Sequence, residues 1–103
     1  MSGRIIAIGD IHGCAAALES IIAAIAPTSD DIVVALGDYV DRGPDSKGVV
    51  DRLIELGQQC ELIALQGNHE EMMLEVVRDN RPPYRWLQYG GMETLDSYGF
   101  VGD

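Results

Sequence analysis

Three short apolar runs alternate with longer amphipathic segments along the chain. Residues 4–8, 32–36 and 60–65 are rich in Ile, Val and Leu, and each run leads into a polar cluster that contains glycine. A short apolar run bounded in this way is typical of a strand buried on both faces of a parallel sheet. We therefore predict three strands over these ranges.

The segments between these runs have the spacing of helices. Residues 14–25 carry apolar side chains at intervals of three and four, and a proline follows: Leu18, Ile21, Ile22, Ile25 and Pro27. A second helix is predicted with Ser46 as its N-terminal cap and Gly57 just past its end. Its apolar face is predicted at Val49, Val50, Leu53 and Ile54.

The last third of the chain predicts shorter elements. After residues 67–70 a third helix is expected, with its apolar side at Met72, Met73, Val76 and Val77. Prolines interrupt the pattern at residues 81–83. Two short helical pieces follow, over residues 84–89 and 92–98, separated by the glycine pair at residues 90–91.

This alternation of strands and helices predicts an α/β fold. Each connection is long enough for a crossover helix, so we expect a parallel βαβαβ sheet, flanked by helices, with right-handed crossovers. A chain of 103 residues has room for one domain.

Composition excludes some classes of partner and compartment. The net charge of −10 argues against nucleic acid and against an acidic membrane surface, whereas clustered carboxylates that bind cations would account for part of it. The apolar run at residues 5–8 is far shorter than the ~20 residues of a membrane span. Cys14 and Cys60 lack metal-type spacing, so we expect free, mostly buried thiols and a reducing, cytoplasmic setting.

The polar clusters that follow the predicted strands carry the candidate chemistry. Parallel strands end at the same edge of a sheet, so the clusters at residues 9–13, 37–43 and 67–70 should meet. Asp10 and His12 can bind one cation, although an isolated pair of this kind could equally be a helix cap and a loop histidine. Asp38 follows its strand as Asp10 does, and its carboxylate could bridge two cations.

The second and third clusters add further candidate site residues. Asp41 and Arg42 could serve the site, or they could form a surface ion pair in a turn. Asn68 offers a neutral oxygen ligand, and the His69 imidazole can protonate a leaving oxygen; otherwise they would be a turn residue and a surface histidine. Both histidines of the chain fall inside these clusters, which favours function. Glu70 is predicted to anchor its loop by pairing with a neighbouring cationic group.

Three sequence blocks resemble the signature of the calcineurin-like phosphoprotein phosphatases, the serine/threonine protein phosphatase family. They are GDIHG at residues 9–13, GDYVDRG at 37–43 and GNHE at 67–70. The resemblance implies that two divalent metal ions are bound, with manganese favoured over iron or zinc. It implies these metal ligands: Asp10, His12, Asp38 as the bridge, and Asn68.

The same resemblance implies the other site roles. His69 matches the family's general acid, and Asp41 matches the aspartate that orients it. Arg42, together with Asn68, matches the groups that bind the substrate phosphate. A hydroxide activated by the two metals would attack phosphorus in line, without a phosphoenzyme.

Later residues look most like the compact bacterial and phage branch of this family. Those residues are Glu70–Leu74, Trp86, Tyr89–Gly91 and Glu93–Leu95. The related symmetrical diadenosine tetraphosphate hydrolases typically replace the aspartate of the middle block, so Asp41 favours the protein phosphatase branch. The expected substrate is therefore a phosphorylated protein or a small phosphoester, with the nucleotide hydrolase as the alternative.

The sequence departs from the family pattern after the third block. Family members use two further histidines and a second arginine downstream, and no histidine follows His69 here. Residues 1–103 therefore resemble the N-terminal half of the four-layer αββα metallophosphoesterase sandwich. The family's second sheet would be largely missing, which should leave apolar surface exposed. A non-catalytic module that binds metal or phosphate is the competing hypothesis.

Overall fold

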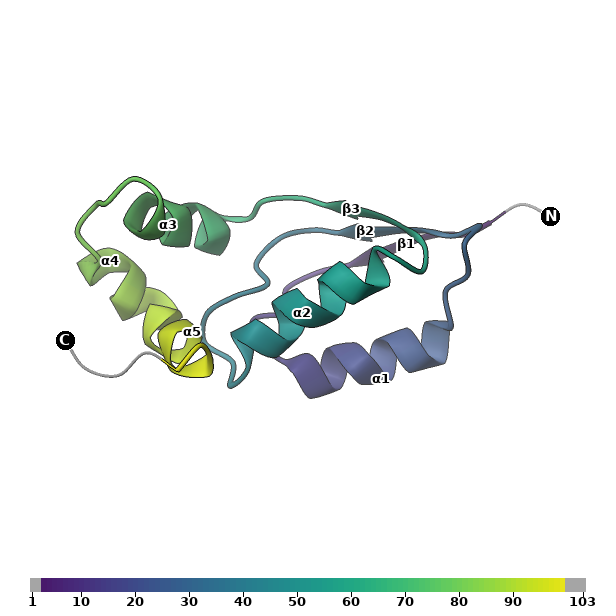
Figure 1. Cartoon of the computed structure of the whole chain (residues 1–103), viewed down its shortest axis with the longest axis horizontal. Coiled ribbons are helices and arrows are strands. Elements are labelled where there is room, and N and C mark those ends of the chain that lie inside the picture. Colours follow the sequence, from purple (N-terminus) through teal and green to yellow (C-terminus); the bar gives the residue numbers. More distant parts are fainter. Residues whose placement is uncertain (1–2, 100–103) are drawn as a thin grey trace.

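A computed structural model describes residues 3–99 and forms a three-stranded parallel sheet. The strands are β1 (Ile5–Ile8), β2 (Ile32–Ala35) and β3 (Glu61–Ala64), in that order across the sheet (Figure 1). In the register, Ile32 lies opposite both Ile5 and Glu61. The predicted α/β fold and strand direction are confirmed, with strands one or two residues shorter than the predicted ranges.

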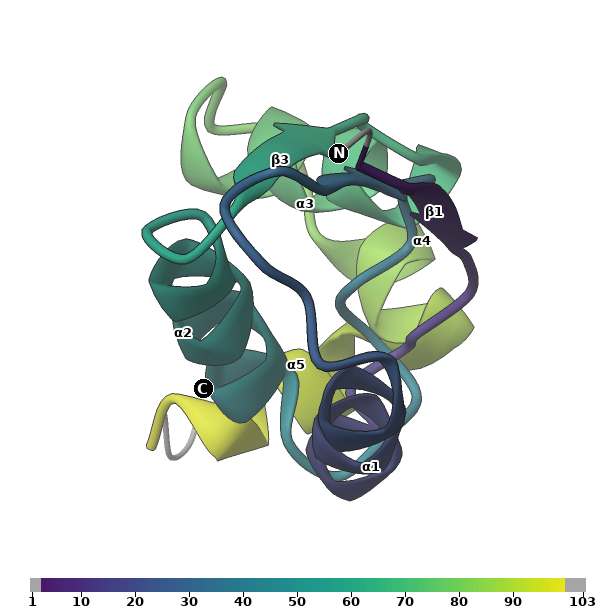
Figure 2. The ribbon, with the colours of Figure 1, turned by 90° about the vertical axis from the view of Figure 1, so that its right-hand side faces the viewer.

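Two helices cover one face of the sheet. They are α1 (Ala15–Ile25) and α2 (Ser46–Leu56), and both lie below the strands in Figure 2. The core between helices and sheet contains Leu18, Val33 and Val49, each at most 1% exposed. Burial of such side chains typically contributes ~1.5–3 kcal/mol each.

The opposite face of the sheet is open within residues 3–99. Ile5 is 77% exposed, and Leu36, Ile63 and Leu65 are also exposed. The interpretation of residues 4–8 as a strand buried on both faces is therefore wrong within residues 3–99, because no described helix packs on this side (Figure 2). The expected exposed apolar surface lies here.

Several helix details also differ from prediction. The cap of α2 is Asp45, whose carboxylate accepts the Gly48 N–H at 2.9 Å, and not Ser46. Ile54 is 62% exposed, and Leu56 takes its place in the core because the buried stripe of α2 is rotated from the predicted one. Gly57 has right-handed dihedral angles (φ −63°), so no left-handed glycine ends α2.

The remaining elements lie beyond the carboxyl ends of the strands. They are α3 (Asn68–Val77), α4 (Tyr84–Trp86), a π-type turn η1 (Leu87–Gly91) and α5 (Met92–Ser97). The predicted interruption occurs at Gly90, where φ is +109°. A β-carbon on Gly91 would lie 2.6 Å from the Trp86 ring, so glycine lets this segment fold tightly. No helix within residues 3–99 is long and apolar enough to cross a membrane.

Candidate active site

The loops that follow β1 and β2 bring three of the four predicted metal ligands together. One ligand atom each from Asp10, His12 and Asp38 can be chosen so that all lie within 4.8 Å of one another. The first two loops are joined by backbone hydrogen bonds, from His12 N–H to Asp38 C=O and from Gly13 N–H to Tyr39 C=O. The surrounding backbone therefore fixes where these side chains start.

All three of these residues have left-handed backbone conformations. Their φ angles are +50° for Asp10, +41° for His12 and +59° for Asp38. This conformation costs a non-glycine residue ~1–3 kcal/mol, and such strain concentrates at functional sites. The turns aim the side chains at a common point beyond the sheet edge.

His12 is held in one tautomer. Its Nδ1 lies 3.0 Å from the Val40 carbonyl oxygen, which can only accept a hydrogen bond. Nδ1 therefore carries the proton, and Nε2 keeps a lone pair for a cation. A ring nitrogen that donates to a backbone carbonyl is the usual support for a metal-binding histidine.

The acidic pair at this point suits a cation. Among residues 3–99, no Lys or Arg nitrogen lies within 4.0 Å of the Asp10 or Asp38 carboxylates. Two uncompensated carboxylates so close together repel each other, and a divalent cation would relieve that repulsion. The mixture of carboxylate and imidazole fits Mn, Fe or Zn.

Glu70 ties the second loop to the third. Its carboxylate accepts hydrogen bonds from the backbone N–H groups of Asp38, Tyr39, Val40 and Gly67, at 2.6, 2.7, 3.3 and 2.9 Å. The predicted pairing of Glu70 with a cationic group is therefore wrong. Four backbone donors satisfy the carboxylate instead, and they fix the backbone of Asp38 from the side of α3.

Asp41 and His69 form a buried pair beside the acidic cluster. His69 Nδ1 lies 2.8 Å from Asp41 Oδ2, and Asp41 is completely buried. The His69 ring meets the His12 ring edge to face, with centroids 4.7 Å apart. Asp41 makes no ion pair with Arg42 in the described structure, so the alternative of a surface turn held by that pair is wrong.

Three residues around Asp41 were given no role in the site from the sequence: Ser46 was predicted only as a helix cap, and Trp86 and Thr94 were matched only to a branch of the family. Trp86 Nε1 lies 2.8 and 2.9 Å from the two Asp41 oxygens, and Thr94 Oγ1 lies 2.7 Å from Oδ1. The Asp41 N–H donates to Thr94 Oγ1 and to Ser46 Oγ. The signal that could have found them was the chain's single Trp and a Thr just after the glycine pair.

Arg42 directly follows Asp41 in the chain, and Asn68 directly precedes His69. The Arg42 N–H donates to the Gly90 C=O at 3.1 Å, and its side chain is exposed. A β-carbon on Gly90 would lie 2.7 Å from Arg42 N, which requires glycine at that position. Asn68 begins α3, directly before His69, whose N–H donates to Asp38 Oδ1 at 3.1 Å.

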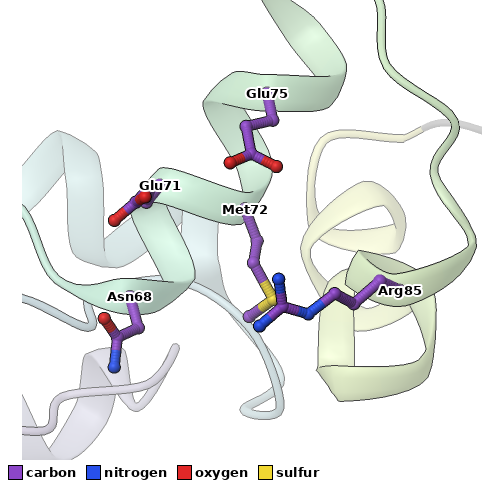
Figure 3. A pocket seen from close by; sticks show the side chains of 5 residues that line it. All are labelled: Asn68, Glu71, Met72, Glu75 and Arg85. Atoms are coloured by element: carbon purple, nitrogen blue, oxygen red, sulfur yellow. The ribbon is translucent and has the colours of Figure 1, made fainter.

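A pocket of about 210 Å³ opens next to Asn68. Its other lining residues are Glu71, Met72, Glu75 and Arg85. Figure 3 shows Arg85 extending from α4 towards Met72 on α3. The pocket therefore places one guanidinium and two carboxylates beside a predicted metal ligand.

Two other titratable groups complete the description. Burial raises the pKa of Tyr39, whose hydroxyl lies within 2.8 Å of the Ala35 and Leu65 carbonyls and so bridges β2 and the loop after β3. Burial likewise raises the pKa of Cys60. Cys14 is exposed, so the prediction that both thiols are mostly buried holds only for Cys60.

Comparison with known proteins places these observations in a family. Residues 3–102 match the sequence profile of calcineurin-like phosphoesterases. The symmetrical bis(5'-nucleosyl)-tetraphosphatase of Bordetella pertussis is 38% identical over 98 residues, which cover 93% of this chain and 32% of that protein. Serine/threonine-protein phosphatase 1 of Salmonella typhimurium is 36% identical over 85 residues, 82% of this chain and 37% of that protein.

A solved structure gives the same result in three dimensions. A crystal structure described as a candidate diadenosine tetraphosphatase superposes with a TM-score of 0.69 at 34% identity. The match covers all of this chain and 40% of that one. This chain thus spans about a third of the length of the two curated relatives above.

Proposed function

Because this chain belongs to the calcineurin-like phosphoesterase family, we propose that it provides the metal-binding and acid-donating part of a phosphomonoester hydrolase. One observation carries the proposal. Within residues 3–99, an acidic cluster without a Lys or Arg partner lies next to a buried Asp41–His69 pair, with the His12 and His69 ring centroids 4.7 Å apart. The groups proposed to bind cations and the group proposed to donate a proton are therefore adjacent.

Four side chains would hold the cations: Asp10, His12, Asp38 and Asn68. When bound, divalent cations neutralise charge on the phosphoryl oxygens and lower the pKa of water, so that hydroxide is present at neutral pH. Manganese is the first choice and iron or zinc the second. The chain's own contribution is to pre-orient the ligands through strained turns and through the Glu70 hydrogen bonds.

His69 is assigned as the general acid. Asp41, when ionised, only accepts hydrogen bonds, so His69 Nδ1 must donate to it. Nε2 is then the nitrogen that exchanges a proton with substrate. When the phosphorus–oxygen bond breaks, the leaving oxygen takes the Nε2 proton and the imidazole becomes neutral.

Arg42 is assigned to bind the substrate phosphate, with Asn68 as a second contact. A guanidinium forms paired hydrogen bonds to phosphate oxygens, and Arg42, next to Asp41 in the chain, has an exposed side chain. Its backbone is fixed by the hydrogen bond to Gly90.

The favoured substrate is a phosphorylated serine or threonine in a protein. The buried Asp41 supports it, since the sequence pattern of the dinucleotide hydrolases typically lacks that aspartate. The second candidate is a dinucleotide polyphosphate, which is supported by the Bordetella relative and by Arg85 in the pocket beside Asn68. Comparing the initial rates on a phosphothreonine peptide and on diadenosine tetraphosphate decides between them.

A cytoplasmic location follows from the same proposal. Both cysteines are free, and the exposed Cys14 thiol suits a reducing compartment. A phosphorylated protein would be the partner met there.

The test combines metal counting with turnover. We expect two Mn²⁺ ions per chain by elemental analysis, and release of p-nitrophenol from p-nitrophenyl phosphate when Mn²⁺ is added. His69→Asn should retain the metal and lose most turnover. One weakly bound ion without turnover would instead support the non-catalytic binding module, and unchanged turnover in His69→Asn would remove the assigned acid.

A further inference from the structure

The Asp41 carboxylate is fully enclosed by donors from a part of the chain distant in sequence. Trp86 Nε1 is 2.8 Å from Oδ1 and 2.9 Å from Oδ2, and Thr94 Oγ1 is 2.7 Å from Oδ1. These contacts join residues 45 and 53 positions apart in the chain. Both donors are almost completely buried, with Trp86 and Thr94 each 2% exposed.

We propose that Trp86 and Thr94 are positioning residues that set the orientation and the tautomer of the His69 acid through Asp41. The inference rests on the proposed role of His69 and goes beyond it. Neither residue touches the substrate or a metal in this assignment. They act by determining which Asp41 oxygen faces His69 and which hydrogen His69 must supply.

A count of hydrogens leads to this assignment. An ionised carboxylate accepts only, so the Trp86 N–H and the single Thr94 hydroxyl hydrogen both point at Asp41. Thr94 Oγ1 then accepts from the Asp41 N–H at 2.8 Å. Ser46 Oγ, 3.0 Å from Thr94 Oγ1, can therefore only donate to it.

The network leaves one oxygen direction for His69. Oδ1 already receives Thr94 and Trp86, whereas Oδ2 receives Trp86 and lies 2.8 Å from His69 Nδ1. His69 must place its hydrogen on Nδ1, so the proton available for the leaving oxygen is the one on Nε2. Removal of either donor would let the carboxylate rotate or take up water, because a buried charge needs its hydrogen bonds.

Packing within residues 84–97 fixes the positions of Trp86 and Thr94. The Trp86 ring lies against Gly91, where a β-carbon would come within 2.6 Å of it. Thr94 lies in the first turn of α5, which contacts α2, the helix that begins with Ser46. The indole and the hydroxyl are thus fixed by two different elements, α4 and α5, that close on the same carboxylate.

The test uses substitutions that keep shape and remove one donor. Trp86→Phe removes the N–H, and Thr94→Val removes the hydroxyl at nearly constant volume. Thr94→Ser restores the hydroxyl and serves as the rescue variant. Leu95→Ala is the matched control, since Leu95 packs beside Trp86 and Tyr98 in the apolar pocket of the same segment but makes no hydrogen bond to Asp41.

The first measurement compares kcat on two aryl phosphates. Phenyl phosphate has a poorer leaving group than p-nitrophenyl phosphate and so depends more on the acid. In Trp86→Phe and Thr94→Val we expect kcat to fall about tenfold more on phenyl phosphate than on p-nitrophenyl phosphate, a fraction of the ~10²–10⁴-fold that a general acid contributes. Thr94→Ser and Leu95→Ala should lower both rates by the same factor.

The second measurement needs neither metal nor turnover. In the metal-free protein, nitrogen chemical shifts of the neutral form of the His69 ring should show its hydrogen on Nδ1. In Trp86→Phe and Thr94→Val a second tautomer should appear, while Leu95→Ala should keep the first. A hydrogen on Nε2 in the unsubstituted protein, or an unchanged tautomer in both donor variants, overturns the proposal.

The outcomes separate this inference from the proposed function. If His69→Asn shows the leaving-group dependence but Trp86→Phe and Thr94→Val do not, the positioning role is wrong and the acid role stands. If His69→Asn lowers both rates equally, the acid role fails, and the positioning of that acid fails with it.

Discussion

The two ends of strand β2 each bury an aspartate, and the two carboxylates are satisfied in different ways. Asp31 precedes the strand and is 3% exposed, and Asp41 follows it and is completely buried. Asp31 accepts from the Arg4 guanidinium at 2.8 Å and from the backbone N–H groups of Arg4 and Thr28. Within the described residues, the donors to the Asp41 carboxylate are the Trp86 indole, the Thr94 hydroxyl and the imidazole of His69.

This difference distinguishes the two ends of β2. We call the end with Asp31 the structural end and the end with Asp41 the chemical end. An arginine keeps its proton under all relevant conditions, so the Arg4–Asp31 pair has one state. A histidine ring has two nitrogens, one that can donate to Asp41 and one that can exchange a proton with substrate, so the Asp41–His69 pair can take part in proton transfer. The molecule thus uses the same residue type for holding strands at one end and for directing a proton at the other.

The largest expected effect comes from Asp41→Asn. The amide would offer a donor or a weaker acceptor to His69 Nδ1, so the imidazole would adopt the wrong tautomer or orientation. We expect kcat on phenyl phosphate to fall about 10³-fold, within the ~10²–10⁴ range for general acids. Steady-state kinetics with Mn²⁺ measures it. Asp31→Asn is the matched variant at the other end of β2, and it should leave kcat within about twofold; an equal loss in both variants would contradict the comparison.

The next largest effect is expected from the hydrogen bonds that Glu70 accepts at the chemical end. Glu70→Gln keeps the shape but replaces a carboxylate that accepts four backbone N–H groups with an amide that has one acceptor oxygen. We expect the free energy of unfolding to fall by ~2–3 kcal/mol, because backbone donors are left unpaired. Urea denaturation measures this loss. Glu71→Gln, on the exposed side of the same helix, is the control and should change stability little.

At the chemical end, the sequence predicted the metal-ligand cluster better than it predicted the contacts of Glu70 and Trp86. The loops after the strands could be paired because parallel strands end at one edge, and the structure brings Asp10, His12 and Asp38 together there. The partners of Glu70 could not be predicted, since they are backbone N–H groups that every residue possesses. Trp86 was matched only to a branch of the family, because its contact with Asp41 depends on how α4 packs against a distant loop.

The fold shows the same division between local and tertiary information. Apolar spacing predicted α2, but it could not determine that Leu56 instead of Ile54 turns inward, since that depends on the helix's rotation against the sheet. For a similar reason, the strand at residues 4–8 was wrongly expected to be buried on both faces. A run such as residues 5–8 is equally apolar whether or not another layer covers it.

A smaller effect is expected at the structural end. Asp31→Asn removes a carboxylate that accepts hydrogen bonds from Arg4, just before β1, and from Thr28, in the loop before β2. We expect the melting temperature to fall by several degrees, which is small for a buried carboxylate because Arg4 is half-exposed and water replaces part of the pairing. Calorimetry measures the shift. Asp51→Asn, in the exposed pair with Lys47, is the control and should lower the melting temperature less.

The smallest effect is a slope of stability against pH. Hydrogen bonds from the Arg4 side chain, then those from the Arg4 and Thr28 N–H groups, hold the pKa of Asp31 well below its usual value. Because the folded pKa is lower than the unfolded value of ~3.9, the unfolded chain binds more protons in that window. The pair's contribution is therefore complete above pH ~4 and is lost as pH falls towards the folded pKa. Other carboxylates also titrate there, so the quantity to measure is the difference between the unsubstituted protein and Asp31→Asn by urea denaturation between pH 2 and 6 (roughly the range in which carboxylates titrate). The two stability curves should converge as the pH drops, and a constant gap across the range would mean that the Arg4 pairing does not depend on the Asp31 charge.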